Sequence, residues 1–111
     1  MSSSKNADSK DHQPIAEIDR LIHEPARLMI MAYLYVVESA DFLFLVHQTG
    51  LTHGNLSSHM SKLEAAGYIE VVKEFVDRKP HTMLQLTDKG QVAFQEYRQS
   101  MMQVLDDLPE S

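Results

Sequence analysis

The sequence predicts an α+β fold that is mainly α-helical with one small β-hairpin, and three features support this prediction. Apolar residues recur at helical spacing on both sides of the segment 68–86. Within that segment the apolar spacing changes to two, which is typical of a strand with one buried face. The 111 residues and the 43% hydrophobic content fit a single domain with one modest core.

The first part of the chain is polar, and helical periodicity begins only after it. Residues 1–13 hold almost no apolar side chains, so we expect a disordered N-terminal tail followed by one domain over residues 14–108. A first predicted helix opens at Pro14, and its apolar stripe contains Ile15, Ile18, Leu21 and Ile22. Pro25 suits the first turn of a second helix, which should extend to about Val37.

The middle of the chain predicts two helices joined by a tight turn. After a brief extended piece around Phe42, a short helix should end at Gly50, a residue that readily adopts the left-handed conformation. Thr52 can cap the next helix, which covers residues 53–66 and stops at Gly67. One arc of this helix is apolar, with Leu56, Met60 and Leu63. The opposite arc is small and polar, with Gly54, Ser58, Ser61 and Lys62.

A hairpin and a final helix complete the predicted fold. The strands cover residues 68–75 and 81–86, and residues 76–80 form the turn between them. Thr87 can cap a last helix that reaches about Leu108. Apolar residues on this helix recur at alternating spacings of three and four residues, as in a coiled-coil seam. The seam comprises Phe94, Tyr97, Met101, Val104 and Leu108.

The order of these elements indicates a nucleic-acid-binding protein. A short helix, a tight turn and a second helix with a polar outer face form a helix-turn-helix, whose second helix fits a DNA major groove about 12 Å wide. Small side chains on that helix let its backbone approach base edges and phosphates closely. A hairpin tip carrying Arg78 and Lys79 can make a second contact with the DNA backbone or minor groove.

Particular stretches of this region match a known pattern. Residues 55–59 read Asn-Leu-Ser-Ser-His, and residues 63–68 read Leu-Glu-Ala-Ala-Gly-Tyr. They are followed by Arg-Lys-Pro at residues 78–80 and Leu-Thr-Asp-Lys-Gly at residues 86–90. Over roughly residues 15–108 the chain resembles the compact winged-helix regulators related to the MarR-like group. That resemblance implies a winged helix-turn-helix fold, a recognition helix that reads double-stranded DNA, a wing that grips the flanking backbone, and terminal helices that form a homodimer.

Two positions depart from the family pattern. Phe42, Leu43 and Phe44 form the entry to the short helix that ends at Gly50, at the point where such proteins usually have a Ser or Thr cap. The recognition helix carries a single lysine, Lys62, where family members are often more basic.

Candidate site residues follow from this interpretation. The predicted DNA contacts are Thr52, His53, Asn55, Ser57, Ser58, His59, Ser61 and Lys62 in the recognition helix 53–66, and Arg78, Lys79 and His81 in the wing 75–81. The predicted dimer contacts are Ile15, Ile18, Ile22, Phe94, Tyr97, Met101, Val104 and Leu108. Together the seam and the first helix carry more apolar surface than one short chain should cover, which predicts a two-fold homodimer.

The charge distribution permits DNA binding despite an acidic total. The formal net charge is −6, which by itself disfavours a phosphate-rich partner. Residues 52–81 are neutral, because Lys62, Lys73, Arg78 and Lys79 balance Glu64, Glu70, Glu74 and Asp77. The remainder therefore carries the whole negative excess, which disfavours indiscriminate adhesion to DNA.

Several other functions find no support in the sequence. The absence of cysteine excludes disulfides and thiolate zinc sites. His53 and His59 are about 240° apart on a helix, so a metal site that includes them and His81 is not expected, nor is a cofactor. Motifs of hydrolases and nucleotide-binding enzymes are missing, which argues against an enzyme. No long apolar run or signal segment occurs, so we expect a cytoplasmic protein without a membrane partner.

Two function classes stay open at this point. The leading one is sequence-specific DNA binding in transcription regulation; the alternative is a winged-helix module that binds protein through the same faces, which the acidic balance suits. A small-molecule effector would have to bind where two chains meet, near residues such as Tyr33, Tyr35, Tyr97, Met101 and Met102.

Overall fold

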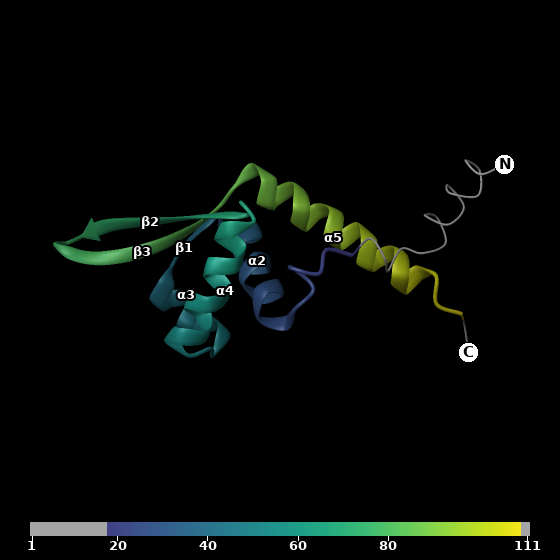
Figure 1. Cartoon of the computed structure of the whole chain (residues 1–111), viewed down its shortest axis with the longest axis horizontal. Helices are drawn as coiled ribbons and strands as arrows, with labels where there is room; N and C mark the ends of the chain where they lie inside the picture. Colours follow the sequence, from purple (N-terminus) through teal and green to yellow (C-terminus); the bar gives the residue numbers. More distant parts are fainter. Residues whose placement is uncertain (1–17, 110–111) are drawn as a thin grey trace.

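The predicted α+β architecture is confirmed. The computed structural model describes residues 18–109, and Figure 1 shows how their helices and strands are arranged. In chain order the elements are α2 (Pro25–Val37), β1 (Ser39–Asp41), α3 (Phe42–Thr49), α4 (His53–Ala65), β2 (Ile69–Val76), β3 (Lys79–Leu86) and α5 (Asp88–Asp106). The helix-turn-helix is therefore α3 and α4, and the wing is the hairpin of β2 and β3.

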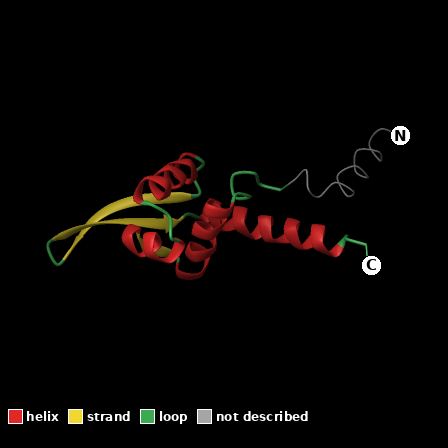
Figure 2. Ribbon diagram, turned by 90° about the horizontal axis from the view of Figure 1, so that it is seen from below, coloured by secondary structure: helices red, strands yellow, loops and turns green. Residues whose placement is uncertain are grey.

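The strands form one antiparallel sheet in the order β1-β3-β2. Leu84 of β3 lies opposite Ala40 of β1 on one side and Val71 of β2 on the other. Figures 1 and 2 show that the hairpin projects beyond the helices, whereas α5 leaves the base of the hairpin and runs the opposite way. The molecule thus has a small central body with two projections.

The core lies where α2, α3 and α4 meet the sheet. Leu56 and Leu63 of α4 are completely buried, in agreement with the apolar arc predicted for this helix. The other fully buried side chains are Ile22, Ile30, Met31, Leu34, Leu45, Ile69 and Leu84. Burial of such side chains is the main stabilising contribution in a domain of this size.

Predicted helix ends are confirmed at three places. Gly50 ends α3 with φ 73°, and Thr52 caps α4 by accepting a hydrogen bond from the N–H of Asn55 at 3.1 Å. Thr87 caps α5 in the same way, since its hydroxyl accepts from the N–H of Gly90 at 2.9 Å. Each residue type was expected there because its side chain or its backbone freedom satisfies groups that a helix end leaves unpaired.

The first predicted helix is wrong in the part that the structure describes. Residues 18–24 form turns, in which Asp19 Oδ1 accepts hydrogen bonds from the N–H groups of Leu21 and Ile22. A short carboxylate side chain that bonds its own following backbone competes with a helix. The hydroxyl of Tyr68 donates to the second oxygen of Asp19, and burial together with this bond raises the pKa of Tyr68 to about 12. The expected tail and Ile15 lie outside the described residues.

The hairpin is longer and its turn tighter than predicted. Val76 pairs with Lys79, so the turn consists of Asp77 and Arg78 rather than residues 76–80. Both turn residues have positive φ, 53° and 67°, as a two-residue hairpin turn of type I′ requires. The sequence signal was weak because Asn-Gly or Asp-Gly is the usual residue pair in such turns.

At the start of α3 an aspartate takes the place of the usual Ser or Thr cap. The helix begins at Phe42 itself, not after it, and Asp41 is its cap: Asp41 Oδ2 accepts from the N–H groups of Leu43 at 2.9 Å and Phe44 at 3.3 Å. The other oxygen, Oδ1, accepts from Nδ1 of His81 at 2.7 Å. Asp41 therefore joins the first helix of the helix-turn-helix to strand β3 of the wing.

We expect Asp41→Ala to lower the free energy of unfolding by about 1–2 kcal/mol at pH 7, because a helix cap and the bond to His81 are lost together. Partial burial raises the pKa of Asp41, but the bonds from His81 and the α3 backbone outweigh it and lower the pKa below 3.8. A lowered pKa stabilises the fold above the unfolded value and ceases to do so as pH falls through the folded value. The difference in unfolding free energy between wild type and variant, measured by urea titration, should therefore shrink as the pH falls from about 5 through the unfolded pKa of an aspartate, about 3.9, and below it.

A matched control for this prediction is Glu64→Ala, which removes an exposed carboxylate from α4. Its effect on the unfolding free energy should stay within about 0.5 kcal/mol. An Asp41→Ala protein as stable as the control at pH 7 would contradict the capping role.

Candidate nucleic-acid interface

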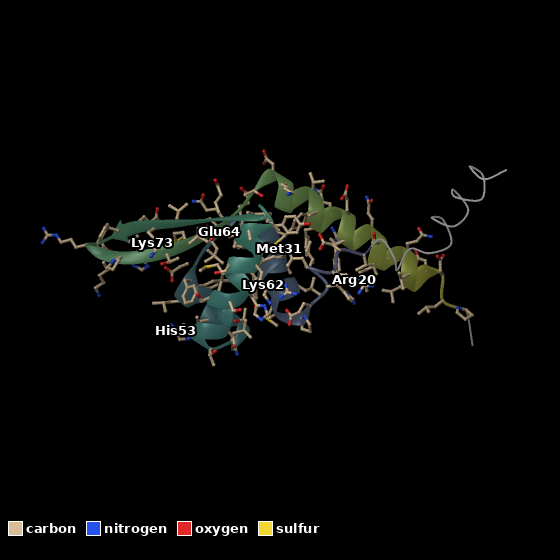
Figure 3. The ribbon with its side chains drawn as sticks, viewed as in Figure 1. Arg20, Met31, His53, Lys62, Glu64 and Lys73 are labelled. Carbon is tan, nitrogen blue, oxygen red and sulfur yellow. The ribbon has the colours of Figure 1, made fainter. Side chains whose placement is uncertain are left out.

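The outer face of α4 is uncovered in the part of the chain that the structure describes. The exposed residues predicted as DNA contacts here are Thr52, His53, Asn55, Ser57, Ser58, Ser61 and Lys62. Figure 3 shows the side chains of His53 and Lys62, which stand near opposite ends of the helix. Leu56 and Leu63 on the opposite side fix the helix to the core, so its small polar side faces outward. The geometry meets the steric requirement for a helix that enters a groove.

The N-terminal end of α4 suits an anionic partner. Thr52 caps the helix, and the first turn contains no acidic residue. The aligned peptide dipoles leave a partial positive charge at this end, which favours a phosphate nearby. His53 is exposed at the same end, so a phosphate could reach both the side chain and the backbone.

His59 differs from the other predicted contacts on α4. Its side chain is 19% exposed, and its Nδ1 atom accepts a hydrogen bond from Nη1 of Arg27 at 3.0 Å. An arginine only donates, so Nδ1 must be the unprotonated ring nitrogen in this bond. Arg27 also donates from Nε to the carbonyl of Leu21 at 2.6 Å. His59 therefore links α4 to α2 and the turn before it.

His81 is likewise held within the protein. It lies on β3 several residues before the core and is half-buried, bonded to Asp41. Its position at the root of the wing, facing β1, gives it a structural role that the sequence pattern did not predict. Sequence alone could not find this pairing because Asp41 and His81 are forty positions apart.

Arg78 and Lys79 stand exposed at the tip of the wing, as predicted. Lys73, exposed on β2 of the same hairpin, was not among the predicted contacts. Figure 3 shows Lys73 on the projecting part of the hairpin. The strand pattern could have identified Lys73, because it follows Ile69 and Val71 at a spacing of two and so lies on the same face of the strand, further along the hairpin.

The predicted dimer residues divide into two groups. Ile18, Ile22, Phe94 and Tyr97 are buried in the core of their own chain, so they leave almost no surface for a second copy. The ring of Phe94 packs on that of Tyr35 at 4.9 Å between centroids, and the hydroxyl of Tyr97 shares a hydrogen bond with Nδ1 of His23 at 2.9 Å. The seam pattern predicts that these side chains are buried, but it does not tell whether the same chain or a second copy buries them.

The outer half of α5 carries the remaining apolar surface. Met101 and Val104 are half-buried, and Leu108, which lies just beyond the end of α5 at Asp106 rather than within the helix, is exposed. Met102 and Leu105, which the seam did not include, are also exposed, at 57% and 60%. Figure 1 shows this half of α5 extending away from the helices of the central body.

One apolar pocket lies apart from these surfaces, on the outer side of α2 and α3. It has a volume of about 560 Å³ and is lined by Met29, Ala32, Tyr33, Val36, Val37 and Phe44. Of the residues named for an effector site, Tyr33 lines this pocket, whereas Tyr35 and Tyr97 both pack on the ring of Phe94. Among residues 18–109, no cluster of potential ligands could hold a metal ion, and no helix there has the length and apolar character to cross a membrane.

Comparison with known proteins identifies the fold family. Residues 26–105 match the family described as a winged helix DNA-binding domain. An uncharacterized protein of Methanocaldococcus jannaschii is 34% identical over 85 residues, which cover 77% of this chain and 92% of that protein. The structure of a transcriptional regulator homologue from Pyrococcus horikoshii OT3 is similar with a TM-score of 0.81 and 33% identity, covering 86% of this chain and 99% of that one.

A more distant structure shares the fold alone. Reduced AbfR bound to DNA is 16% identical, with a TM-score of 0.63, and the match covers 98% of this chain and 76% of that chain. These similarities agree with the exposed α4 face and the projecting hairpin described above. The chain belongs to the winged helix DNA-binding domain family, which confirms the winged helix-turn-helix expected from its residues.

Proposed function

We propose that this protein regulates transcription as a homodimer that binds double-stranded DNA sequence-specifically. Helix α4 enters the major groove, and the wing tip with Arg78 and Lys79 contacts the flanking backbone. The observation that carries the proposal is the outer face of α4, which is small, polar and uncovered while Leu56 and Leu63 anchor the other side. The DNA complex of AbfR, which shares this fold, supports it.

The proposed homodimer uses the outer half of α5. Met102 and Leu105 on α5, and Leu108 just after its end, expose apolar surface close together in the sequence. A second copy related by a two-fold axis would cover this surface and double the DNA contact. Two α4 helices placed about 34 Å apart would then meet successive major grooves of a palindromic site.

A protein-binding function is the second candidate, because the α2–α3 pocket exposes Val36, Val37 and Phe44. The two functions predict different responses to salt. Binding through phosphate contacts weakens steeply as salt displaces the released counterions, whereas binding through an apolar pocket does not. The salt slope therefore separates the two candidates.

The DNA proposal is tested by selecting duplexes of about 30 base pairs from a random-sequence pool and measuring their affinity by fluorescence anisotropy. Lys62→Ala should reduce affinity about tenfold and lower the salt slope by about one, since one cationic contact is lost. The matched control is Lys89→Ala, an exposed lysine at the start of α5, which should bind like wild type. Failure to select any duplex, or equal loss in both variants, would count against the proposal.

Arg78 allows charge and stability to be separated at the wing tip. Its φ of 67° is strained for any residue with a Cβ atom. Arg78→Gly and Arg78→Ala should therefore lose the same DNA affinity, whereas the glycine variant should be more stable than the alanine variant by about 1 kcal/mol. Anisotropy and thermal unfolding of both variants measure the two effects. Unequal affinities of the two variants would show that the conformation of the turn, and not the charge alone, contributes to DNA binding.

The dimer is tested by Leu105→Glu, which places a charge in the proposed interface. Its dimer dissociation constant, measured by analytical ultracentrifugation, should rise at least about tenfold, because an unpaired charge is costly to bury. Gln103→Glu introduces the same charge at an exposed position about 160° from Leu105 around α5, and should leave the constant unchanged. A wild-type protein that sediments as a monomer at micromolar concentration would refute the dimer itself.

A further inference from the structure

The projecting part of the hairpin exposes an aromatic ring. Phe75 lies on β2 opposite Pro80, and 77% of its surface is exposed. This residue is two positions from the Asp77–Arg78 turn, so it stands close to the outermost point of the wing. From Val71, where the strand leaves the core, to the turn the hairpin extends by about 20 Å at roughly 3.3 Å per residue. A large apolar side chain there does not contribute to the core.

The strand register places the acidic residues of the two strands on one face of the hairpin. Residues that pair across antiparallel strands point to the same side of the sheet. On the side that carries the buried residues Ile69 and Leu84, the projecting part continues with Lys73 and Phe75, which pair with Thr82 and Pro80. No acidic residue of β2 or β3 lies on that side within this projection.

The acidic residues of the same strand lie on the other face. Glu70 and Glu74 alternate with Lys73 and Phe75, and Glu74 pairs with His81. The neutral charge of this segment therefore hides two different surfaces. One carries Glu70 and Glu74 together with Lys79 and His81; the other carries no carboxylate and combines Lys73, Phe75 and Pro80 next to the basic tip residue Arg78.

We propose that Phe75 contacts duplex DNA directly, with its ring against the sugar and base edges of the minor groove next to the site read by α4. This rests on the proposed DNA-binding function and adds an apolar contact to it. Lys73 and Arg78 on either side of Phe75 attract the phosphates that border the groove. Apolar side chains of this kind pack against base steps in the minor groove, and Pro80 gives the ring a rigid neighbour.

The charges favour DNA over an apolar protein surface as the occupant. An exposed ring flanked by cations fits a polyanion with apolar sugar edges, whereas a protein-docking patch is usually depleted of lysine at its centre. The chain as a whole is acidic, with a formal net charge of −6. The basic and aromatic residues at the wing tip therefore form a local surface that differs in charge from the rest of the molecule.

The experiment compares Phe75→Thr with Val76→Thr, using the selected duplex as probe. Threonine is itself a residue that strands favour, so both variants should fold. Val76 is the next residue on the same strand, is 45% exposed and points to the opposite face. Phe75→Thr should lose about tenfold in affinity with an unchanged salt slope, because no cation is removed. Val76→Thr should bind within about twofold of wild type.

Hydroxyl-radical footprinting, which reports sugar exposure in the minor groove, gives an independent readout. Wild type and Val76→Thr should protect a short segment flanking the α4 site, and Phe75→Thr should lose that protection. Equal affinity and equal footprints for both variants would overturn the role of Phe75 while leaving the proposed function standing. Absence of duplex binding by wild type would overturn both, and a Phe75→Thr protein whose dimer dissociation constant rises instead would assign the ring to protein contact.

Discussion

The arrangement of the whole molecule depends on how α4 is divided between core and solvent. Leu56 and Leu63 are completely buried against α2 and the sheet, and this burial fixes the rotation of the helix about its axis. Once that rotation is fixed, the serines and Lys62 must face outward. The bond from Arg27 to His59 adds a directional constraint at the edge of the same interface. A recognition surface made of weakly interacting small residues is held in place by strong apolar packing behind it.

Features encoded by nearby residues could be predicted from the sequence. Gly50, Thr52 and Thr87 act within their own helix ends, so residue type and position suffice. The apolar arc of α4 and the change to strand spacing were correct for the same reason. The outward face of α4, which carries most of the candidate site, follows directly from these local patterns.

Features that depend on distant partners could not be predicted. The seam of α5 correctly indicated burial, but Phe94 and Tyr97 found their partners in the same chain. His59 and His81 looked like free polar residues until folding brought Arg27 and Asp41 beside them. Asp19 replaced a predicted helix by a turn because one carboxylate bonds its own backbone and Tyr68. In each case a single long-range or competing contact decided the outcome.

The alternation of side chains along the hairpin limits how its length can change. Removal of one residue from each strand beyond the core would turn every later side chain over, so that Glu74 would come to the side now held by Phe75. Removal of two from each strand would shorten the arm and keep the sides as they are. Relatives with shorter or longer arms can therefore preserve the sorted surface only if insertions and deletions occur in even steps on both strands.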